Sequence, residues 1–341
     1  MTVIPSGLGA TWGLGQETTV GTAVTPTRFL PVNSDKVVGS KKTVQSEALH
    51  SGLFELGARR RLVMHEAKGQ VDLDLTDRGL GLLLKNMIGS SATAVQQGGS
   101  AAYLQQHTPG DTLGLGLTLQ SGRPDITGTI RAFTYNGAKV TDWELSCSTA
   151  GLAKLTATFD AWDESTATAY TAPSYTAANV LSFVDASLLL GATITTTSGI
   201  ASYSAGTAPV GTVKSVSIKG QNGLAVDRQQ VGSLTKREAL SNAFRKYTGQ
   251  MVVEFANLTE LYNLYYADTA TSLVVSFTGG TAIAASYYPG LTIICPQIFL
   301  DGAPPATDGP GVLELTIPFT ILDDGTDPPI QFNYMSKDTT L

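Results

Sequence analysis

Alternation of apolar and polar positions is the main pattern along the chain, and it predicts a protein built largely of β-strands. The segments 129–135, 139–146 and 153–159 each alternate in this way. Because Asn-Gly pairs favour the positive φ angles of tight hairpin turns, Asn136-Gly137 predicts a turn between the first two segments.

Two short apolar segments, 80–88 and 261–267, interrupt the strand pattern and predict one short helix each. The start of a helix is stabilised when the residue before it has a side-chain oxygen that accepts hydrogen bonds from the free backbone amides of the first turn. Thr76 or Asp77 is placed to cap the first helix in this way, and Asn257 the second.

The elements recur along the chain in the same order, which indicates two copies of one supersecondary unit. Gly69-Gln70 opens the strand VDLDL and Gly249-Gln250 opens MVVEF, at an offset of 249 − 69 = 180. The closing strands begin at Leu155 and Leu315, at an offset of 160. The first copy therefore carries 180 − 160 = 20 additional residues, which we place around 90–102.

Each copy also has a long charged segment ahead of its Gly-Gln pair, at 36–68 and at 214–247. The apolar face of a sheet must be buried against another element. One short helix per copy is too small to cover it, so we expect a second sheet to cover the rest. We therefore expect a mainly β fold of two tandem β-sandwich units, each with one short flanking α-helix and a long charged hairpin or loop. The predicted boundaries are an N-terminal arm at 1–31, a first domain at 32–168, a Thr/Ala/Pro-rich linker at 169–180, and a second domain with a C-terminal tail at 181–341.

Composition narrows the classes of function. Charged residues are 15% of the 341 positions, against roughly 25% in an average soluble protein, and the formal net charge is 22 − 28 = −6. An acidic chain is a poor candidate for wrapping nucleic acid, and a surface so poor in charge is typical of one covered by other protein. No apolar run is long enough for a membrane helix and no secretion signal opens the chain, so we expect a soluble protein that is not secreted and has no membrane partner.

The sequence predicts no enzyme, no catalytic residue, no metal site and no cofactor. His65-Glu66 begins like a zinc-binding helix, but Gly69 occupies the position of the second ligand. We expect His50, His65 and His107 to be surface residues, and Cys147 and Cys295 to be buried inert thiols.

Four stretches carry a resemblance to a known family. These are GATWGLGQETTVGTAVTPTRFLPV at 9–32, the segment 121–164 with its Gly-Arg-Pro-Asp turn, the segment 218–240, and LTIPFTILDDGTDPPIQFNY at 315–334. Together they resemble the tail tube, or major tail, proteins of long-tailed, non-contractile bacteriophages (siphophages). The resemblance implies tail-tube-like β-sandwich domains that assemble into rings, usually sixfold, and stack into a tube.

The resemblance also implies partners. The tube would surround a tape measure protein, meet tail terminator and distal tail proteins at its ends, and let double-stranded DNA pass during ejection without binding it specifically. The protein would lie in the virion tail and assemble in the bacterial host cytoplasm. With two tube-like units in one chain, three chains would complete a pseudo-sixfold ring, the alternative being a ring of six chains.

Candidate site residues follow from charge and alternation. We expect contacts between subunits or rings from the basic residues of the two charged segments, which are Arg59, Arg60, Arg61, Lys236, Arg237, Arg245 and Lys246. For the arginine run the alternatives are contact with phosphate or a merely solvated loop. The arm 1–31 and the tail 323–341 are expected to connect rings.

Alternation also puts Asp72, Asp74 and Glu254 opposite the core-facing side chains, so they are candidates to line the lumen and repel DNA. An exposed outer face or a subunit contact is the other interpretation of these three acids. The alternative function is a carbohydrate-binding or adhesive β-sandwich module of a tail fibre or surface structure. That function calls for clustered surface aromatics, whereas Trp12, Trp143 and Trp162 are widely spaced.

Overall fold

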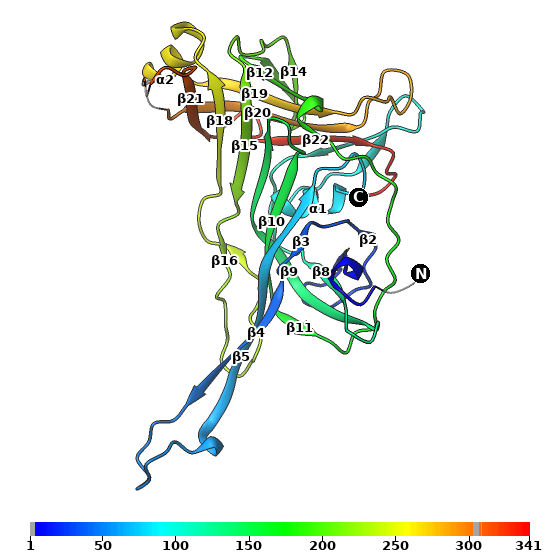
Figure 1. Cartoon of the computed structure of the whole chain (residues 1–341), viewed down its shortest axis with the longest axis vertical. Coiled ribbons are helices and arrows are strands. Elements are labelled where there is room, and N and C mark those ends of the chain that lie inside the picture. The colour runs from blue at the N-terminus through cyan, green and yellow to red at the C-terminus, as the bar shows by residue number, and fades with distance from the viewer. Residues whose placement is uncertain (1–3, 303–306, 308) are drawn as a thin grey trace.

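The computed structural model describes residues 4–302, 307 and 309–341, and it is mainly β, as predicted (Figure 1). The elements of the first half are β1 (Thr11–Gln16), β2 (Arg28–Phe29), β3 (Ser34–Asp35), β4 (Val38–Gln45), β5 (Arg60–Asp74), α1 (Gly81–Ile88), β6 (Ala94–Gln96), β7 (Tyr103–His107), β8 (Leu117–Pro124), β9 (Ile130–Ser148), β10 (Lys154–Ala161) and β11 (Asp163–Ser165). The elements of the second half are β12 (Ala186–Leu190), β13 (Thr193–Thr197), β14 (Ile200–Ser204), β15 (Val213–Gln221), β16 (Leu224–Ala225), β17 (Leu240–Ser241), β18 (Lys246–Glu254), the π-helical turn η4 (Leu258–Tyr262), α2 (Asn263–Tyr266), β19 (Thr271–Thr278), β20 (Gly290–Leu300), β21 (Glu314–Ile321) and β22 (Gln331–Ser336).

One antiparallel sheet, which we call the long sheet, runs through both halves of the chain. Its strands lie in the order β4, β5, β10, β9, β15, β18 and β21, with β3 continuing the β4 edge. The pairing of β9 with β15 joins the two halves, and we call this junction the internal seam. In Figure 1 β4 and β5 project from the lower end of the molecule as a long hairpin, which matches the charged hairpin predicted for the first copy.

Two further groups of strands pack against the long sheet. One has the order β2, β1, β8, β9, β11, and the other has the order β12, β19, β20, β22, β7, β6. β9 and β20 each belong to two groups, because their first and last parts pair with different strands. The buried apolar side chains of both halves form one large contiguous cluster. The layers therefore share a core, as expected for sheets packed face to face.

The predicted hairpin turn at Asn136-Gly137 is wrong. β9 continues through this pair, pairing with β8 as far as Ala138 and with β10 from Lys139 onward. Gly137 has φ of +62°, and the indole of Trp162 lies so close that a Cβ at this position would approach it within 2.7 Å. A positive φ serves a bend inside a strand as well as it serves a turn, so the pair marks the corner where β9 passes between sheets.

The recurrence seen in the sequence has a direct counterpart in strand pairing. The series β1, β4, β5, α1, β8, β9, β10, β11 corresponds to the series β12, β15, β18, α2, β19, β20, β21, β22. The register corresponds as well, since Gly69 lies opposite Phe159 in one half and Gly249 lies opposite Phe319 in the other. Both offsets, 180 and 160, are therefore matched by equivalent hydrogen-bonded pairs.

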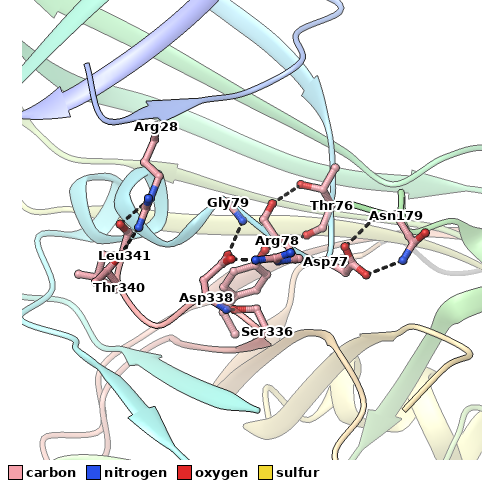
Figure 2. Close-up of polar contacts among 11 residues, drawn as sticks. Arg28, Thr76, Asp77, Arg78, Gly79, Asn179, Ser336, Asp338, Thr340 and Leu341 are labelled. Carbon is pink, nitrogen blue, oxygen red and sulfur yellow. Dashed lines mark hydrogen bonds and ion pairs between the residues drawn. The ribbon is translucent and has the colours of Figure 1, made fainter. Parts of the chain in front are cut away.

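The predicted helices are present, but the predicted cap of the first is wrong. α1 follows Leu80, which makes no side-chain cap, and it ends at the left-handed Gly89. Asp77 instead accepts hydrogen bonds from the backbone and side-chain amides of Asn179, at 2.7 and 2.8 Å (Figure 2), so its carboxylate is used between segments. Thr76 donates to the carbonyl of Arg78.

The additional residues of the first copy form β6 and β7. β7 pairs with β22 at the far end of the chain, with Gln105 opposite Tyr334. The insertion thus extends a sheet of the second half and ties the two halves together.

Both chain ends depart from the predicted arm and tail. β1 lies between β2 and β8, with Trp12 and Leu14 buried, so this part of segment 1–31 is an integral strand; residues 1–3 lie outside the described residues. Within 323–341, β22 lies between β7 and β20. Figure 2 shows the last residues folded back: Asp338 accepts from Arg78 and from the amide of Gly79, and Arg28 donates to Leu341. Local alternation could not show that these strands are central, because their partners are distant in sequence.

Candidate functional site

The side of the long sheet that faces away from the core carries a band of polar side chains, which we call the polar face. Asp72 and Asp74 alternate with the buried Val71 and Leu73, and Glu254 follows the buried Val253. Because side chains alternate between the two faces of a strand, the three predicted acids share this face.

Three more acids lie on the same face, and the sequence analysis missed them. The polar face includes the carboxylates of Asp72, Asp74, Asp142, Glu144, Glu254 and Glu314 and the lysines Lys36, Lys68, Lys154, Lys214, Lys219 and Lys246. Strand register aligns Asp72, Thr156, Glu144 and Lys219 in one row across four strands. The alternation in β9 and β21 carried the signal that would have identified the missing acids.

Asp72 is held ionised by its neighbours. Burial raises the pKa of its carboxyl, but hydrogen bonds from Ser34 (2.5 Å), Gln70 (2.6 Å) and Thr156 (2.9 Å) together outweigh burial and lower the pKa below its ordinary value. The ammonium of Lys36, 3.8 Å away, acts in the same direction. A carboxylate with several donors is a stable negative charge and a poor general acid.

The acids of the polar face are partly paired with lysines. Lys214 lies 2.8 Å from Glu254, and its hydrogen bond, with those of Thr212, lowers the pKa of Glu254. Lys219 lies 3.2 Å from Glu144, and Asn33 donates to Asp74 at 2.8 Å. The face therefore carries interspersed carboxylates and lysines, and Asp72, Glu144 and Glu254 each form an ion pair with a lysine.

The arginine run lies at the far end of the long hairpin, where Arg60 pairs with Gln45 and Arg61 with Val44 just before the tip. Arg59 donates to the carbonyl of Ala48 (2.7 Å) and Arg60 to the hydroxyl of Thr43 (3.2 Å), while Arg61 is exposed. Among the described residues, none of the three arginines makes an ion pair.

The tip of the same hairpin is apolar and uncovered. Leu49 is 99% exposed, Leu53 95% and Phe54 84%. A cluster of exposed apolar side chains beside unpaired arginines is typical of a surface that contacts another protein.

The second charged segment takes a different course and folds over the first half of the chain. Lys236 is buried and pairs with Asp160, and Arg245 donates to the carbonyls of Ile88 (2.9 Å) and Gly110 (2.6 Å). Both side chains are thus used within one chain, which the sequence analysis did not predict. Arg237 is exposed and donates to Gln230 of its own loop, and Lys246 is exposed on β18.

The remaining titratable groups provide no catalytic arrangement. In the described part of the chain, no group of three or more His, Cys, Asp or Glu side chains is placed to hold a metal ion. Cys147 and Cys295 are free and buried, as predicted, and burial raises the pKa of both thiols. The expectation of three surface histidines is wrong for His107, which is fully buried.

The three tryptophans do not form an exposed cluster of the kind that carbohydrate modules use. Trp12 and Trp143 are 1% and 2% exposed and pack against Phe159 and Phe332. Trp162 packs on Gly137 at the corner of β9. Trp12 and Trp143 thus belong to the core, and Trp162 supports the corner of β9.

Comparison with known proteins identifies a family whose model matches the chain. A family model described as phage tail tube protein matches residues 7–321, nearly the whole chain. No curated protein matches the chain. No helix among the described residues is long and apolar enough to span a membrane.

Proposed function

The chain belongs to the phage tail tube protein family, so its role is structural, in the virion tail, and we propose that three copies close into a pseudo-sixfold ring. Rings of this kind stack into the tube of a siphophage tail. The tube encloses the tape measure protein, ends at tail terminator and distal tail proteins, and conducts the genome during ejection. Assembly takes place in the bacterial host cytoplasm, and the protein catalyses no reaction.

The observation that carries this proposal is the recurrence of strand pairing. Each half of the chain presents the same order of elements, with Gly69 opposite Phe159 and Gly249 opposite Phe319. Six equivalent units close a sixfold ring, and each chain supplies two. The internal seam is then one of two alternating junctions around the ring.

The polar face is proposed to line the lumen. Hydrogen bonds lower the pKa of Asp72 and of Glu254, and negative charge repels phosphates across roughly a Debye length of 8–10 Å. The lysines that pair with Glu144 and Glu254 moderate this charge without making the surface basic. Such a wall lets a duplex pass without holding it.

Electron microscopy of purified protein at high concentration tests the ring. We expect hollow tubes whose end views have threefold symmetry at high resolution and sixfold symmetry at low resolution. The mass per ring should equal three chains of 35.7 kDa. Six chains per ring, with the two halves in different layers, would contradict the proposal.

Ejection kinetics test the lumen. Phage carrying Asp72→Lys, Asp74→Lys and Glu254→Lys together should assemble tails but eject DNA more slowly, because added positive charge binds phosphate. Asp227→Lys is the matched control, since Asp227 is exposed and outside the polar face. Equal ejection rates in the triple variant and the control would exclude these acids from the lumen.

A further inference from the structure

The internal seam shows how the second unit contacts the first within one chain. Beyond the end of β15, the amide of Asn222 donates to the carbonyl of Thr141 (2.8 Å). Its side chain donates to the carbonyl of Met87, in the last turn of α1 (2.8 Å), and Arg245 donates to Ile88. The second unit thus covers the C-terminal end of helix α1 in the first unit.

Strand register identifies the equivalent residues on the outer edge of the first unit. Gln221 lies opposite Lys246 in the second unit, as Ser40 lies opposite Glu66 in the first. The next residue along, Asn222, therefore corresponds to Lys41. Lys41 lies opposite His65, which occupies the position of Arg245.

The same comparison identifies the equivalent receiving position on the second unit. Val140 lies opposite Phe159, as Leu300 lies opposite Phe319. Asp301 therefore corresponds to Thr141. Its carboxylate accepts a hydrogen bond from Thr320 (2.6 Å) and is exposed.

Helix α2 of the second unit corresponds to α1 of the first, but no other segment of the described chain covers its C-terminal end. α1 and α2 are each followed by a left-handed residue, Gly89 with φ of +72° and Asp268 with φ of +49°. Two residues before these lie Met87, which is 1% exposed, and Tyr266, which is 78% exposed. The covering segment that α1 receives from the second half is missing at α2.

Both outer edges are open in the described residues, and their charges are complementary. β4 pairs only with β5, and β21 pairs with β20 only over Phe319–Ile321. In the sequence, segment 34–68 holds seven Lys or Arg and four Asp or Glu, a net charge of 7 − 4 = +3. Segment 299–327 holds six Asp or Glu and no Lys or Arg, a net charge of −6. Open strand edges of opposite charge favour head-to-tail association.

We propose that the β3–β4 edge of one copy docks on the acidic β20–β21 edge of a second copy, with Lys41 beside Asp301 and above the last turn of α2. The contact repeats the internal seam, with Lys41 in the place of Asn222. A cation is favoured at the C-terminal end of a helix. This inference rests on the proposed self-assembly and names the surfaces that perform it.

Cysteine cross-linking tests the contact directly. Lys41→Cys protein mixed with Asp301→Cys protein and treated with a short thiol-reactive cross-linker should give covalent dimers, and the double variant should give a ladder of oligomers. Lys154→Cys with Asp301→Cys is the matched control, because Lys154 is also exposed but lies on β10, away from the β3–β4 edge. The native Cys147 and Cys295 are buried and should not react.

The outcomes separate this contact from the proposed function. Cross-linking in the Lys41 pair but not in the Lys154 pair supports the contact, even if no tubes form. Tubes of wild-type protein without cross-linking in the Lys41 pair overturn the contact and leave the tube function standing. Absence of both tubes and cross-links overturns both.

A charge exchange adds a second readout. Lys41→Asp should raise the protein concentration needed for assembly by about fivefold or more, since it places a negative charge against an acidic edge and above the C-terminal end of α2. Combining it with Asp301→Lys should restore assembly toward the wild-type concentration. Failure of the second substitution to restore assembly counts against the pairing.

Discussion

The ammonium nitrogen of Lys139 lies 2.6 Å from a carboxylate oxygen of Glu238, and the lysine side chain is only 4% exposed. Lys139 belongs to β9 in the first half, and Glu238 belongs to the loop of the second half that covers it. Two backbone carbonyls, of Thr112 and Ala239, complete the environment of the ammonium. This buried pair fixes the second charged segment on the first unit.

Removing the negative charge should destabilise the protein. Glu238→Gln leaves the buried Lys139 without its countercharge, so we expect a loss of about 3 kcal/mol in the free energy of unfolding. Urea unfolding measures this loss. Adding Lys139→Met should recover part of it, because the unpaired charge is then gone. A loss below about 0.5 kcal/mol for Glu238→Gln would show that the pair does not hold the loop.

Stability should fall in mild acid because of His107. Burial, with the charge of Lys85, lowers the pKa of His107 from 6.5 to about 3. Between these values the unfolded chain binds a proton that the folded chain does not. The free energy of unfolding therefore falls as pH falls from 6.5 toward 3, by about 1.4 kcal/mol per pH unit.

Replacing His107 isolates this effect. Between pH 7.5 and pH 4.5, the free energy of unfolding of the His107→Gln variant should fall by about 2–3 kcal/mol less than that of wild type. Urea unfolding at both pH values measures the difference. The carboxylates contribute equally to both proteins. Identical pH dependence in the two would show that folding does not lower the pKa of His107.

The glycines opposite the two phenylalanines should not accept a side chain. A Cβ at Gly249 would lie 2.2 Å from the ring of Phe319, and a Cβ at Gly69 would lie 2.1 Å from the carbonyl oxygen of Lys36. We expect Gly69→Ala and Gly249→Ala each to cost about 1–3 kcal/mol. Gly57→Ala is the control, because its Cβ would meet nothing within 4 Å. Equal denaturant midpoints for all three variants would contradict the close packing.

The fold-back of the C-terminus should contribute to stability through Asp338. Its carboxylate lies 3.0 Å from Arg78 and 2.6 Å from the amide of Gly79, with the side chain 11% exposed. Asp338→Asn should cost about 1–3 kcal/mol, since a largely buried charged acceptor is lost. Asp227→Asn, at an exposed site, should change stability by less than about 0.5 kcal/mol. Thermal melting of the two variants side by side provides the comparison.

Local sequence patterns were reliable where a segment's structure depends on its own residues. The segment 80–88 is almost entirely apolar and became α1, and the strand VDLDL alternates and became part of β5. Asn136-Gly137 was misread because a left-handed residue fits both a turn and a bend within a strand. The end strands β1 and β22 were misread because short alternating segments do not reveal whether they lie at an edge or in the centre of a sheet.

The sequence by itself determined the recurrence, since Gly-Gln pairs and closing strands repeat at fixed offsets, and it determined which side chains of each strand face the core. Only the tertiary structure decided which edges meet. The pairing of β9 with β15 joins residues about 70 positions apart, such as Cys147 with Val216, and it buries Asn222 and Lys236 against the first half. Such pairings depend on the fit of whole layers and on desolvated polar contacts, which no local period encodes.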